Sequence, residues 1–284
     1  MKGTGMTSDE PTVPSGGTAS KARRLPFDTS VANQARVYDY LLGGKNNYAA
    51  DRAAAEAVLK IAPETVFTAR ANRAFLGRVV RYLAGQAGMR QFLDIGTGIP
   101  TSGNTHQVAQ EIAPEIRVVY VDYDPIVLAH ARALLTSHEA GATEYIDADL
   151  RDTDTILSRA RQLLDFSKPV AITLISIMHA IPDSDDPHGI VARLLDAVPS
   201  GSYVALSHMA SDILDDSTQQ GLENVTGRLI QQQLTYRNRD QVARFFEGTD
   251  LVAPGLVRVE EWQPDDETGD ASRSFLWCGV GRKR

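Results

Sequence analysis

The sequence predicts an α/β fold in which a mainly parallel sheet is covered by helices on both faces. Five short runs rich in β-branched or apolar residues alternate along the chain with segments of helical pattern. This alternation is expected of parallel strands joined by helical crossovers. Three of the runs are almost continuously apolar, as strands buried on both faces are. With 284 residues, of which 43% are hydrophobic and 23% charged, the chain can bury one large core or two modest ones.

The N-terminal part of the chain differs from the rest. Residues 1–29 are rich in Gly, Ser, Thr, Pro and Lys and lack the apolar segment of a secretion signal, so we expect a disordered tail. We expect residues 30–88 to form a helical cover that precedes the sheet. Apolar residues recur there at helical spacing in three sets, which are Val31, Ala35, Tyr38 and Leu42, then Ala53, Ala54, Ala57, Val58 and Ile61, then Val66, Phe75, Leu76, Val79, Val80 and Leu83.

Strand and helix patterns alternate after the predicted cover. The predicted strands are 91–95, 116–122, 142–147, 170–177 and 202–208, and the predicted helices are 105–112, 126–135, 153–164 and 189–198.

The C-terminal part ends this alternation. Polar helices are expected from about 213 to 247. Two further strands, 256–262 and 272–281, are joined by the short acidic loop QPDDETGDA and should therefore be antiparallel. We expect one strand of this hairpin to lie beside the parallel set, so that residues 89–284 form one domain.

Composition excludes several classes of protein. The net charge of −7 gives no overall attraction for nucleic acid or an anionic membrane, so we expect neither as a partner. The single cysteine, Cys278, excludes an internal disulfide and a cysteine-based metal cage and fits a cytoplasmic location. The longest apolar run, 170–181, is shorter than the roughly 18–20 residues that span a bilayer.

The most informative segment is FLDIGTGIPTSGNTH, residues 92–106. A buried strand ends in an acid, Asp94, and a Gly-x-Gly turn then leads into a helix. In doubly wound sheets, ligands bind at the carboxyl ends of the strands. Gly96 and Gly98 have no Cβ, so the backbone could approach such a ligand closely. Loop glycines are common, however, and the turn alone is weak evidence.

Two further acids strengthen the prediction of a binding site. Asp122 closes the second strand and Asp149 follows the third, so three successive strands place an acid at the same edge of the sheet. For a nucleoside ligand, Asp122 can accept hydrogen bonds from a ribose diol and Asp149 can accept one from an adenine amino group. Asp94 can order the loop or hold an ammonium group through water. The alternative for each acid is capping of the following helix.

These segments resemble a known family. Residues 92–100, 119–125 and 145–152 look like successive motifs of class I S-adenosylmethionine-dependent methyltransferases. From about Ala32 to Gly281 the chain is similar to a bacterial family of S-adenosyl methyltransferases first catalogued as a domain of unknown function, on segments such as RVYDYLLGGKNNYAADR, DADLRD and HAIPDSDDP.

The resemblance implies a Rossmann-like class I methyltransferase fold, with a seven-stranded, mainly parallel sheet whose last strand is antiparallel. It implies S-adenosyl-L-methionine as cofactor, with Gly96 and Gly98 beside the methionine moiety, Asp122 at the ribose and Asp149 at the adenine. An NAD-dependent oxidoreductase is the less favoured alternative, because Thr101 stands where the third glycine of an NAD site would be and Asp94 would repel a diphosphate.

The corner GGKNNY, residues 43–48, has two interpretations. It could be a mobile lid in which Tyr38, Asn46 and Asn47 contact the cofactor, since a cationic sulfonium is attracted to an aromatic face by roughly 0.5–2 kcal/mol. The alternative is ordinary capping of two helices beside core tyrosines.

His179, after the fourth strand, lies where class I enzymes contact their acceptor, and it is the candidate general base. The alternative is a structural histidine in an enzyme that works by positioning alone. The spacing of His106, His179 and His208 shows no ligand motif, so we predict no metal site.

The predicted function is therefore methyl transfer from S-adenosylmethionine to a small-molecule acceptor. The alternative is a non-catalytic module that has the methyltransferase fold and binds an adenosyl ligand. The sequence defines neither the acceptor nor the oligomeric state.

Overall fold

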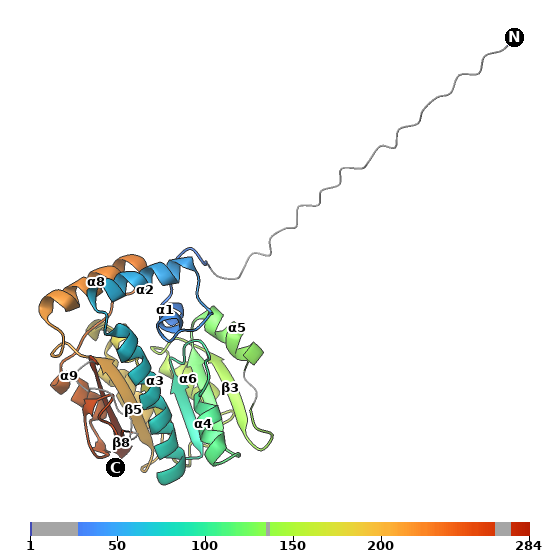
Figure 1. Cartoon of the computed structure of the whole chain (residues 1–284). Coiled ribbons are helices and arrows are strands. Elements are labelled where there is room, and N and C mark those ends of the chain that lie inside the picture. Colours follow the sequence, from blue (N-terminus) through green and yellow to red (C-terminus); the bar gives the residue numbers. More distant parts are fainter. Residues whose placement is uncertain (2–27, 135–136, 265–273) are drawn as a thin grey trace.

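The computed structural model describes Met1 and residues 28–134, 137–264 and 274–284 (Figure 1). Most of the predicted tail, 1–29, and most of the loop that joins the two C-terminal strands therefore lie outside the described residues. The rest of the chain forms a central sheet, with helices on its two faces and a group of helices above one edge (Figure 1).

The sheet has the predicted mainly parallel topology. Its strand order is β3 (Ala142–Asp147), β2 (Arg117–Asp122), β1 (Gln91–Ile95), β4 (Ala171–Ile175), β5 (Tyr203–Met209), β8 (Leu276–Lys283) and β6 (Thr249–Leu251). The first five strands in this order pair in parallel, and β8 is antiparallel to both β5 and β6. The expected mainly parallel sheet with an antiparallel last strand is confirmed, and an eighth strand, β7 (Val257–Arg258), pairs with β8 beside the seven in this order. The strand order reverses between β1 and β4, which is where ligands bind in such sheets.

The predicted C-terminal hairpin is only partly correct. Of the segment 256–262, only β7 (Val257–Arg258) is a strand, and it pairs with β8 over two residues. The strand at the edge beyond β8 is instead β6, whose three residues Thr249, Asp250 and Leu251 are too few to give a recognisable alternation in the sequence.

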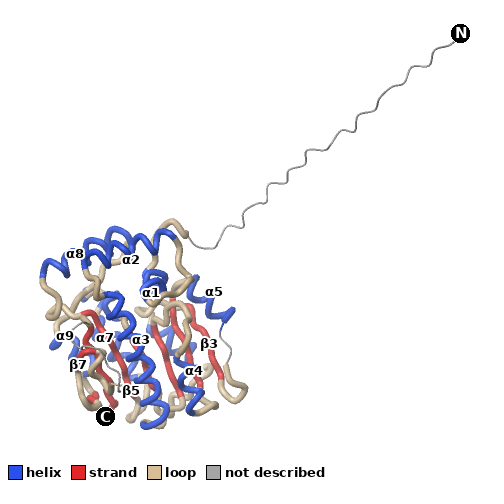
Figure 2. Tube along the Cα trace, in the orientation of Figure 1, coloured by secondary structure: helices blue, strands red, loops and turns tan. Residues whose placement is uncertain are grey.

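Two apolar layers cover the sheet because successive side chains of each strand point to opposite faces. Phe92 of β1 packs in a cluster with α3 (Thr65–Arg81) and α4 (Thr105–Ile112), whereas its neighbour Leu93 packs with α6 (Thr153–Ala160) and α7 (Pro187–Asp196). Figure 2 shows α3 and α4 on one face of the strands. The remaining helical segments are α5 (Pro125–Leu134), α9 (Arg239–Ala243), the π-helical turn Tyr82–Gln86 and the short 3-10 turns Met178–Ala180, Asp183–Asp185 and Arg244–Phe246.

A group of helices lies above the carboxyl edge of the sheet (Figure 1). It consists of α1 (Gln34–Leu41), α2 (Ala49–Ile61) and α8 (Asp216–Leu229), and α8 packs against α2 although it comes from the other end of the chain. A buried ion pair between Arg36 and Asp51, 2.9 Å apart, holds α1 to α2. The cover over the edge thus combines helices from residues 30–88 with one from outside that range.

The apolar face predicted for α1 is shifted. Val31 precedes the helix and is 36% exposed, whereas Arg36, Val37, Asp39 and Leu41 are buried. Three charged residues, Arg36 and Asp39 of α1 and Asp51 of α2, are thus buried at this corner, and hydrophobic spacing gives no signal for buried charge.

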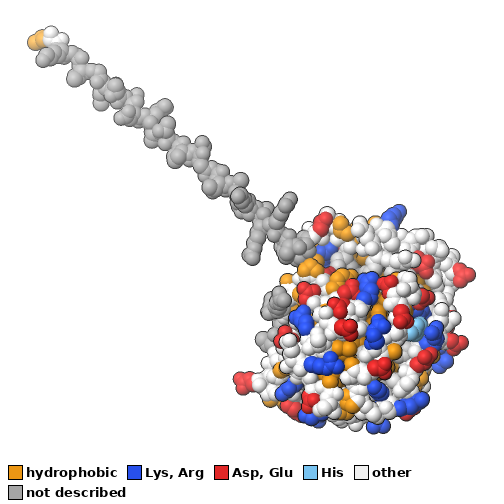
Figure 3. Space-filling view, turned by 180° about the vertical axis from the view of Figure 1, so that it is seen from behind, with side chains coloured by type: hydrophobic (Ala, Val, Ile, Leu, Met, Phe, Trp, Pro, Cys, Tyr) orange, Lys and Arg blue, Asp and Glu red, His pale blue; other side chains and the backbone are white. Residues whose placement is uncertain are grey.

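Acidic and basic side chains are interspersed on the surface seen in Figure 3. Among the described residues no helix is both long and apolar enough to cross a membrane. The same part of the chain contains no group of three or more His, Cys, Asp or Glu residues suited to a metal ion.

Candidate functional site

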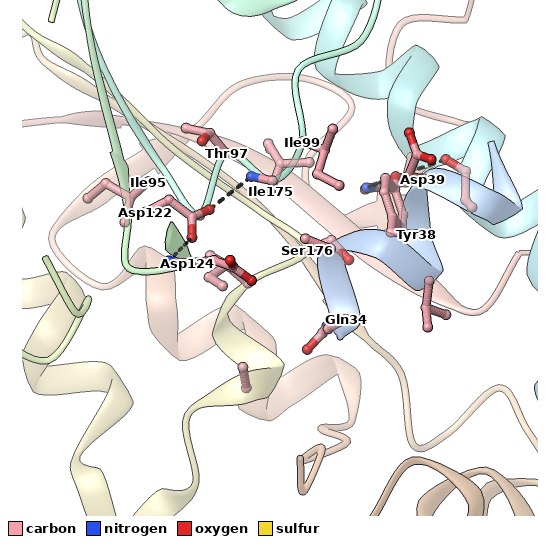
Figure 4. A pocket seen from close by; sticks show the side chains of 18 of the residues that line it. Gln34, Tyr38, Asp39, Ile95, Thr97, Ile99, Asp122, Asp124, Ile175 and Ser176 are labelled. Carbon is pink, nitrogen blue, oxygen red and sulfur yellow. Dashed lines mark hydrogen bonds between the residues drawn. The ribbon is translucent and has the colours of Figure 1, made fainter. Parts of the chain in front are cut away.

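A cavity of about 260 Å³ lies between the carboxyl edge of the sheet and the cover helices. Its floor comes from the ends of β1, β2 and β4 and the loop after β3, and its roof from α1, α3 and the segment that follows α8. In the close view of Figure 4, Asp122 and Asp124 lie on one side and Tyr38 and Asp39 on the other, with Ser176 between them. Most predicted site residues line this cavity.

The glycine turn after β1 requires its glycines for two reasons. Gly96 and Gly98 have φ angles of +75° and +62°, in the left-handed region that side chains disfavour. A Cβ on Gly96 would also lie 2.5 Å from Cγ1 of Ile177, whereas a Cβ on Gly98 would meet nothing within 4 Å. Gly98 donates its backbone N–H to Asp122 Oδ2 at 3.0 Å. The turn therefore brings backbone amides to the acid at the end of the next strand.

Asp122 lies at the centre of the floor. One carboxylate oxygen accepts the N–H of Gly98 at 3.0 Å and the other accepts the N–H of Asp124 at 3.0 Å. Burial raises the pKa of Asp122 from 3.8 to about 6, despite these hydrogen bonds. Each oxygen keeps a further lone pair. The carboxylate can therefore accept hydrogen bonds from two adjacent hydroxyls of a ligand.

Asp94 ties three elements together. Its oxygens accept hydrogen bonds from Thr105 Oγ1 at 2.6 Å and from Thr173 Oγ1 at 2.7 Å, which join β1 to α4 and β4. The side chain is 6% exposed, and burial raises the pKa of this carboxyl. Asp94 lines the cavity and sets the position of the glycine turn, which supports the loop-ordering role among those predicted for it.

Asp149 occupies the outer end of the cavity, where 39% of its side chain is exposed. Arg151 donates to its two oxygens from Nε at 2.9 Å and from Nη2 at 3.0 Å. Burial raises the pKa of Asp149, but the hydrogen bonds from Arg151 outweigh this and the net shift is downward. The carboxylate is therefore held charged and in a fixed orientation.

None of the three predicted acids caps the helix that follows it. The N-caps of α4 and α6 are Asn104 and Asp152. At α5 it is Asp124 whose side chain accepts the N–H of Ile126 at 2.7 Å. The capping alternative is therefore wrong for Asp94, Asp122 and Asp149.

Tyr38 reaches the cavity from the cover. Its hydroxyl donates to the carbonyl of Ala69 and accepts from Asn72 Nδ2, each at 3.0 Å. Asn72 Oδ1 in turn accepts from Ser207 Oγ on β5 at 2.6 Å. Burial raises the pKa of Tyr38. This chain of hydrogen bonds fixes α1 to α3 and the sheet.

Asn46 and Asn47 are not among the residues that line the cavity. The backbone N–H of Asn46 and the side-chain amide of Asn47 both donate to Asp39 Oδ2, at 2.8 and 2.9 Å. The corner GGKNNY is thus wrapped around a buried carboxylate, which neither interpretation of the sequence included. Asn46 and Asn47 could affect a ligand only through Asp39, so direct contact with the cofactor stays a prediction that this geometry does not favour.

His179 lies behind the cavity wall rather than on it. The side chain is fully buried, and its Nε2 lies 3.1 Å from the side-chain nitrogen of Gln34, a residue that does line the cavity. Burial, with a smaller effect of Arg237, lowers the pKa of His179 to about 4. A histidine in this state is a weak base, so its predicted catalytic role would require Gln34 to move aside.

Sequence reasoning misses the contact between Asn33 and Asp124, whereas it considers Arg73 as a residue that points toward the site. Asp124 accepts a hydrogen bond from Asn33 Nδ2, which joins the start of α1 to the sheet edge. Arg73 donates from Nη2 to the carbonyls of Ser102 and Gly103 in the loop after β1. For Asp124 a signal was present, because it stands two residues after the strand in VDYDP.

Comparison with known proteins shows the family to which the chain belongs. The chain matches a family model described as S-adenosyl methyltransferase over residues 20–284. A DUF574 family protein from Streptomyces avermitilis MA-4680 shares 43% sequence identity, over 90% of this chain and 99% of that one, with a TM-score of 0.87. A provisionally named methyltransferase from Thermobifida fusca YX shares 40% identity, over 90% and 97% of the two chains, with a TM-score of 0.83. A search of the curated proteins returned no match.

The sheet order, the glycine turn with its three acids and the match over residues 20–284 agree with one another. The chain belongs to the S-adenosyl methyltransferase family, with the class I methyltransferase fold.

Proposed function

We propose that this protein transfers the methyl group of S-adenosylmethionine to a small-molecule acceptor bound in the cavity under α1. The observation that carries the proposal is the position of Asp122. Its partly buried carboxylate is held by the amide of the Gly96–Gly98 turn and lines the cavity with lone pairs left for a diol.

The donor set of the cavity fits the proposed cofactor. Asp122 would bind the ribose hydroxyls, Asp149 would bind the adenine amino group, and Ala148 and Leu150 beside it would contact the ring. The turn at Gly96 and Gly98 would lie along the methionine moiety, where a Cβ on Gly98 would meet nothing within 4 Å. A sulfonium with an ammonium group suits an acidic cavity better than a diphosphate does.

S-adenosylmethionine supplies an electrophilic methyl group bound to a positively charged sulfur. The chain contributes position and exclusion of water, since α1 covers the cavity and its hydrogen bonds to α3 and to Asp124 hold it there. Orientation of the two reactants is a sufficient source of rate acceleration for an in-line displacement.

The acceptor is proposed to be small because it would share the cavity, of about 260 Å³, with the cofactor. We propose the cytoplasm as the compartment. Nucleic acid and membrane are not proposed as partners, given the net charge of −7.

Isothermal titration tests the proposal. We expect saturable binding of S-adenosylmethionine and S-adenosylhomocysteine, and transfer of labelled methyl to a member of a metabolite panel. Binding without transfer to any member of a broad panel would favour the non-catalytic module. Absence of binding of both ligands at millimolar concentration would refute the proposal.

A further inference from the structure

Asp39 is a buried carboxylate that the fold is built to hold. It lies in the last turn of α1 and is 2% exposed. Its Oδ2 accepts the N–H of Asn46 at 2.8 Å and the side-chain amide of Asn47 at 2.9 Å. The chain also passes so close at Gly44 that a Cβ there would lie 2.1 Å from Asp39 Oδ1. This explains why the corner needs both glycine and asparagine.

The charge of Asp39 is not balanced within the part of the chain that the structure describes. No Lys, Arg or His among those residues forms an ion pair with it, and no hydrogen bond from them reaches Oδ1. Asp39 nevertheless lines the cavity. A carboxylate taken out of water without a cation is costly, so this arrangement favours a positively charged or hydrogen-bond-donating group in the cavity.

The roof around Asp39 is largely apolar. The described residues that line the cavity from α1, α2, α8 and the segment that follows α8 include no other charged side chain, and α3 contributes Arg73. Leu41, Val58, Ile230 and Leu234 are among the apolar ones. Asp122, Asp149 and the glycine turn belong to the floor, where the cofactor is proposed to lie. Figure 4 shows Asp39 across the cavity from Asp122.

The charges along the whole cavity point to the same kind of acceptor. Its lining contains five aspartates and two arginines. Arg151 is already paired with Asp149 and Asp185, and Arg73 donates to the loop after β1. A carboxylate or phosphate acceptor would therefore be repelled, whereas a cation would be attracted.

We propose that the methyl acceptor is a small, largely apolar amine and that Asp39 binds its nitrogen and takes a proton from it. The inference rests on the proposed methyl transfer and names the substrate class of that site. It also gives the site a proton acceptor that is among the residues lining the cavity, which His179 is not.

The step balances in protons and electrons. The bound ammonium gives one proton to Asp39, and the nitrogen lone pair then forms the new N–C bond. The S–C bond breaks as its electron pair stays on sulfur, which becomes a neutral thioether. The proton on Asp39 passes to solvent, so that the methylated ammonium again faces a carboxylate. One proton is released for each methyl group transferred.

The substitution Asp39→Asn tests this assignment while it keeps a side chain of the same size in the GGKNNY corner. The asparagine oxygen can still accept from Asn46 and Asn47, while an amide NH₂ replaces Oδ1, the oxygen that accepts neither of these hydrogen bonds. The probes are benzylamine, benzyl alcohol and benzoate, which share a ring of similar size and differ in charge. Their dissociation constants are measured by calorimetry on protein saturated with S-adenosylhomocysteine.

We expect the wild-type protein to bind benzylamine at least roughly tenfold more tightly than the other two probes, because a charge-assisted hydrogen bond is lost with either. Asp39→Asn should remove this preference. The control Asp149→Asn, at the opposite end of the cavity, should weaken S-adenosylhomocysteine and keep the preference for the amine. An amine preference that is absent in the wild type, or that survives in Asp39→Asn, overturns the inference.

A second comparison separates an acceptor role from a cofactor role. S-adenosylhomocysteine carries an ammonium group, whereas 5′-methylthioadenosine does not. If Asp39→Asn weakens the first ligand but not the second, Asp39 serves the cofactor and the inference is wrong. If the wild type binds neither ligand, the proposed function itself fails, and the two failures are therefore distinguishable.

Discussion

Replacing Asp122 by Asn should change ligand binding and pH-dependent stability together. The variant keeps the size of the side chain but removes its charge and one of its two acceptor oxygens. In the wild type, Asp122 accepts the backbone N–H groups of Gly98 and Asp124, each at 3.0 Å. The single amide oxygen of the asparagine can accept one of these hydrogen bonds but not both. Affinity for S-adenosylhomocysteine should fall, because an amide NH₂ would face one of the ribose hydroxyls.

The pH dependence follows from the burial of the carboxyl. Because burial raises the pKa of Asp122 from 3.8 to about 6, the folded protein binds this proton more tightly than the unfolded chain does. The stability that this provides is complete below pH 4 and is lost as the pH rises through about 6. The difference corresponds to about 3 kcal/mol of unfolding free energy, to an order of magnitude.

Asp122→Asn does not titrate, so its unfolding free energy minus that of the wild type should rise by up to about 3 kcal/mol between pH 4 and pH 8. Denaturant unfolding of both proteins at a series of pH values measures this difference. The test uses only the change of the difference with pH, so a constant stability offset between the two proteins does not affect it. Asp149→Asn is the matched control. Because the pKa of Asp149 is lowered below 3.8 in the folded protein, most of the change in the corresponding difference lies below pH 4, and between pH 4 and pH 8 that difference should fall only slightly. A difference for Asp122→Asn that is flat, or that falls with pH, would refute the reasoning.

Four further outcomes are expected. Gly44→Ala should lower stability by about 1–3 kcal/mol, because the added Cβ would clash with Asp39; thermal unfolding that matches the wild type would contradict this. Asn33→Ala should cost about 1 kcal/mol of unfolding free energy, since Asn33 caps α1, and it should speed hydrogen exchange in α1 because the bond to Asp124 is also lost. If the GGKNNY corner is a lid, hydrogen exchange over residues 36–52 should slow on addition of S-adenosylhomocysteine; equal rates with and without ligand would favour capping. His179→Gln should leave affinity for S-adenosylhomocysteine unchanged and, if His179 is the base, lower the rate of methyl transfer.

The sheet was predictable because each parallel strand carries its own signal. The segments 91–95 and 142–147 are strands with the predicted bounds, and helix 105–112 also begins and ends as predicted. The edge strand β6 was not predictable, because three residues give no periodicity. Its position depends on pairing with β8, which is a tertiary interaction.

The site residues also fall into those with a local sequence signal and those that depend on tertiary contacts. Residues at strand ends could be placed from the sequence, because the fold sends the carboxyl ends of parallel strands to one edge; Asp94, Asp122 and Asp149 all line the cavity. The burial of Asp39 could not be predicted, because a charged residue on an amphipathic helix is expected on its solvent-exposed face. His179 was placed near the correct edge, but its burial depends on Gln34 and on the packing of neighbouring segments.

The central claim is that the cavity floor binds an adenosyl ligand through Asp122. The most direct measurement is calorimetric titration of S-adenosylhomocysteine and of its 2′-deoxy analogue into the wild type and Asp122→Ala. We predict saturable binding to the wild type, and a loss of about 1–3 kcal/mol in Asp122→Ala that is much smaller for the deoxy analogue. Equal losses for both ligands, or no binding to the wild type, would contradict the claim.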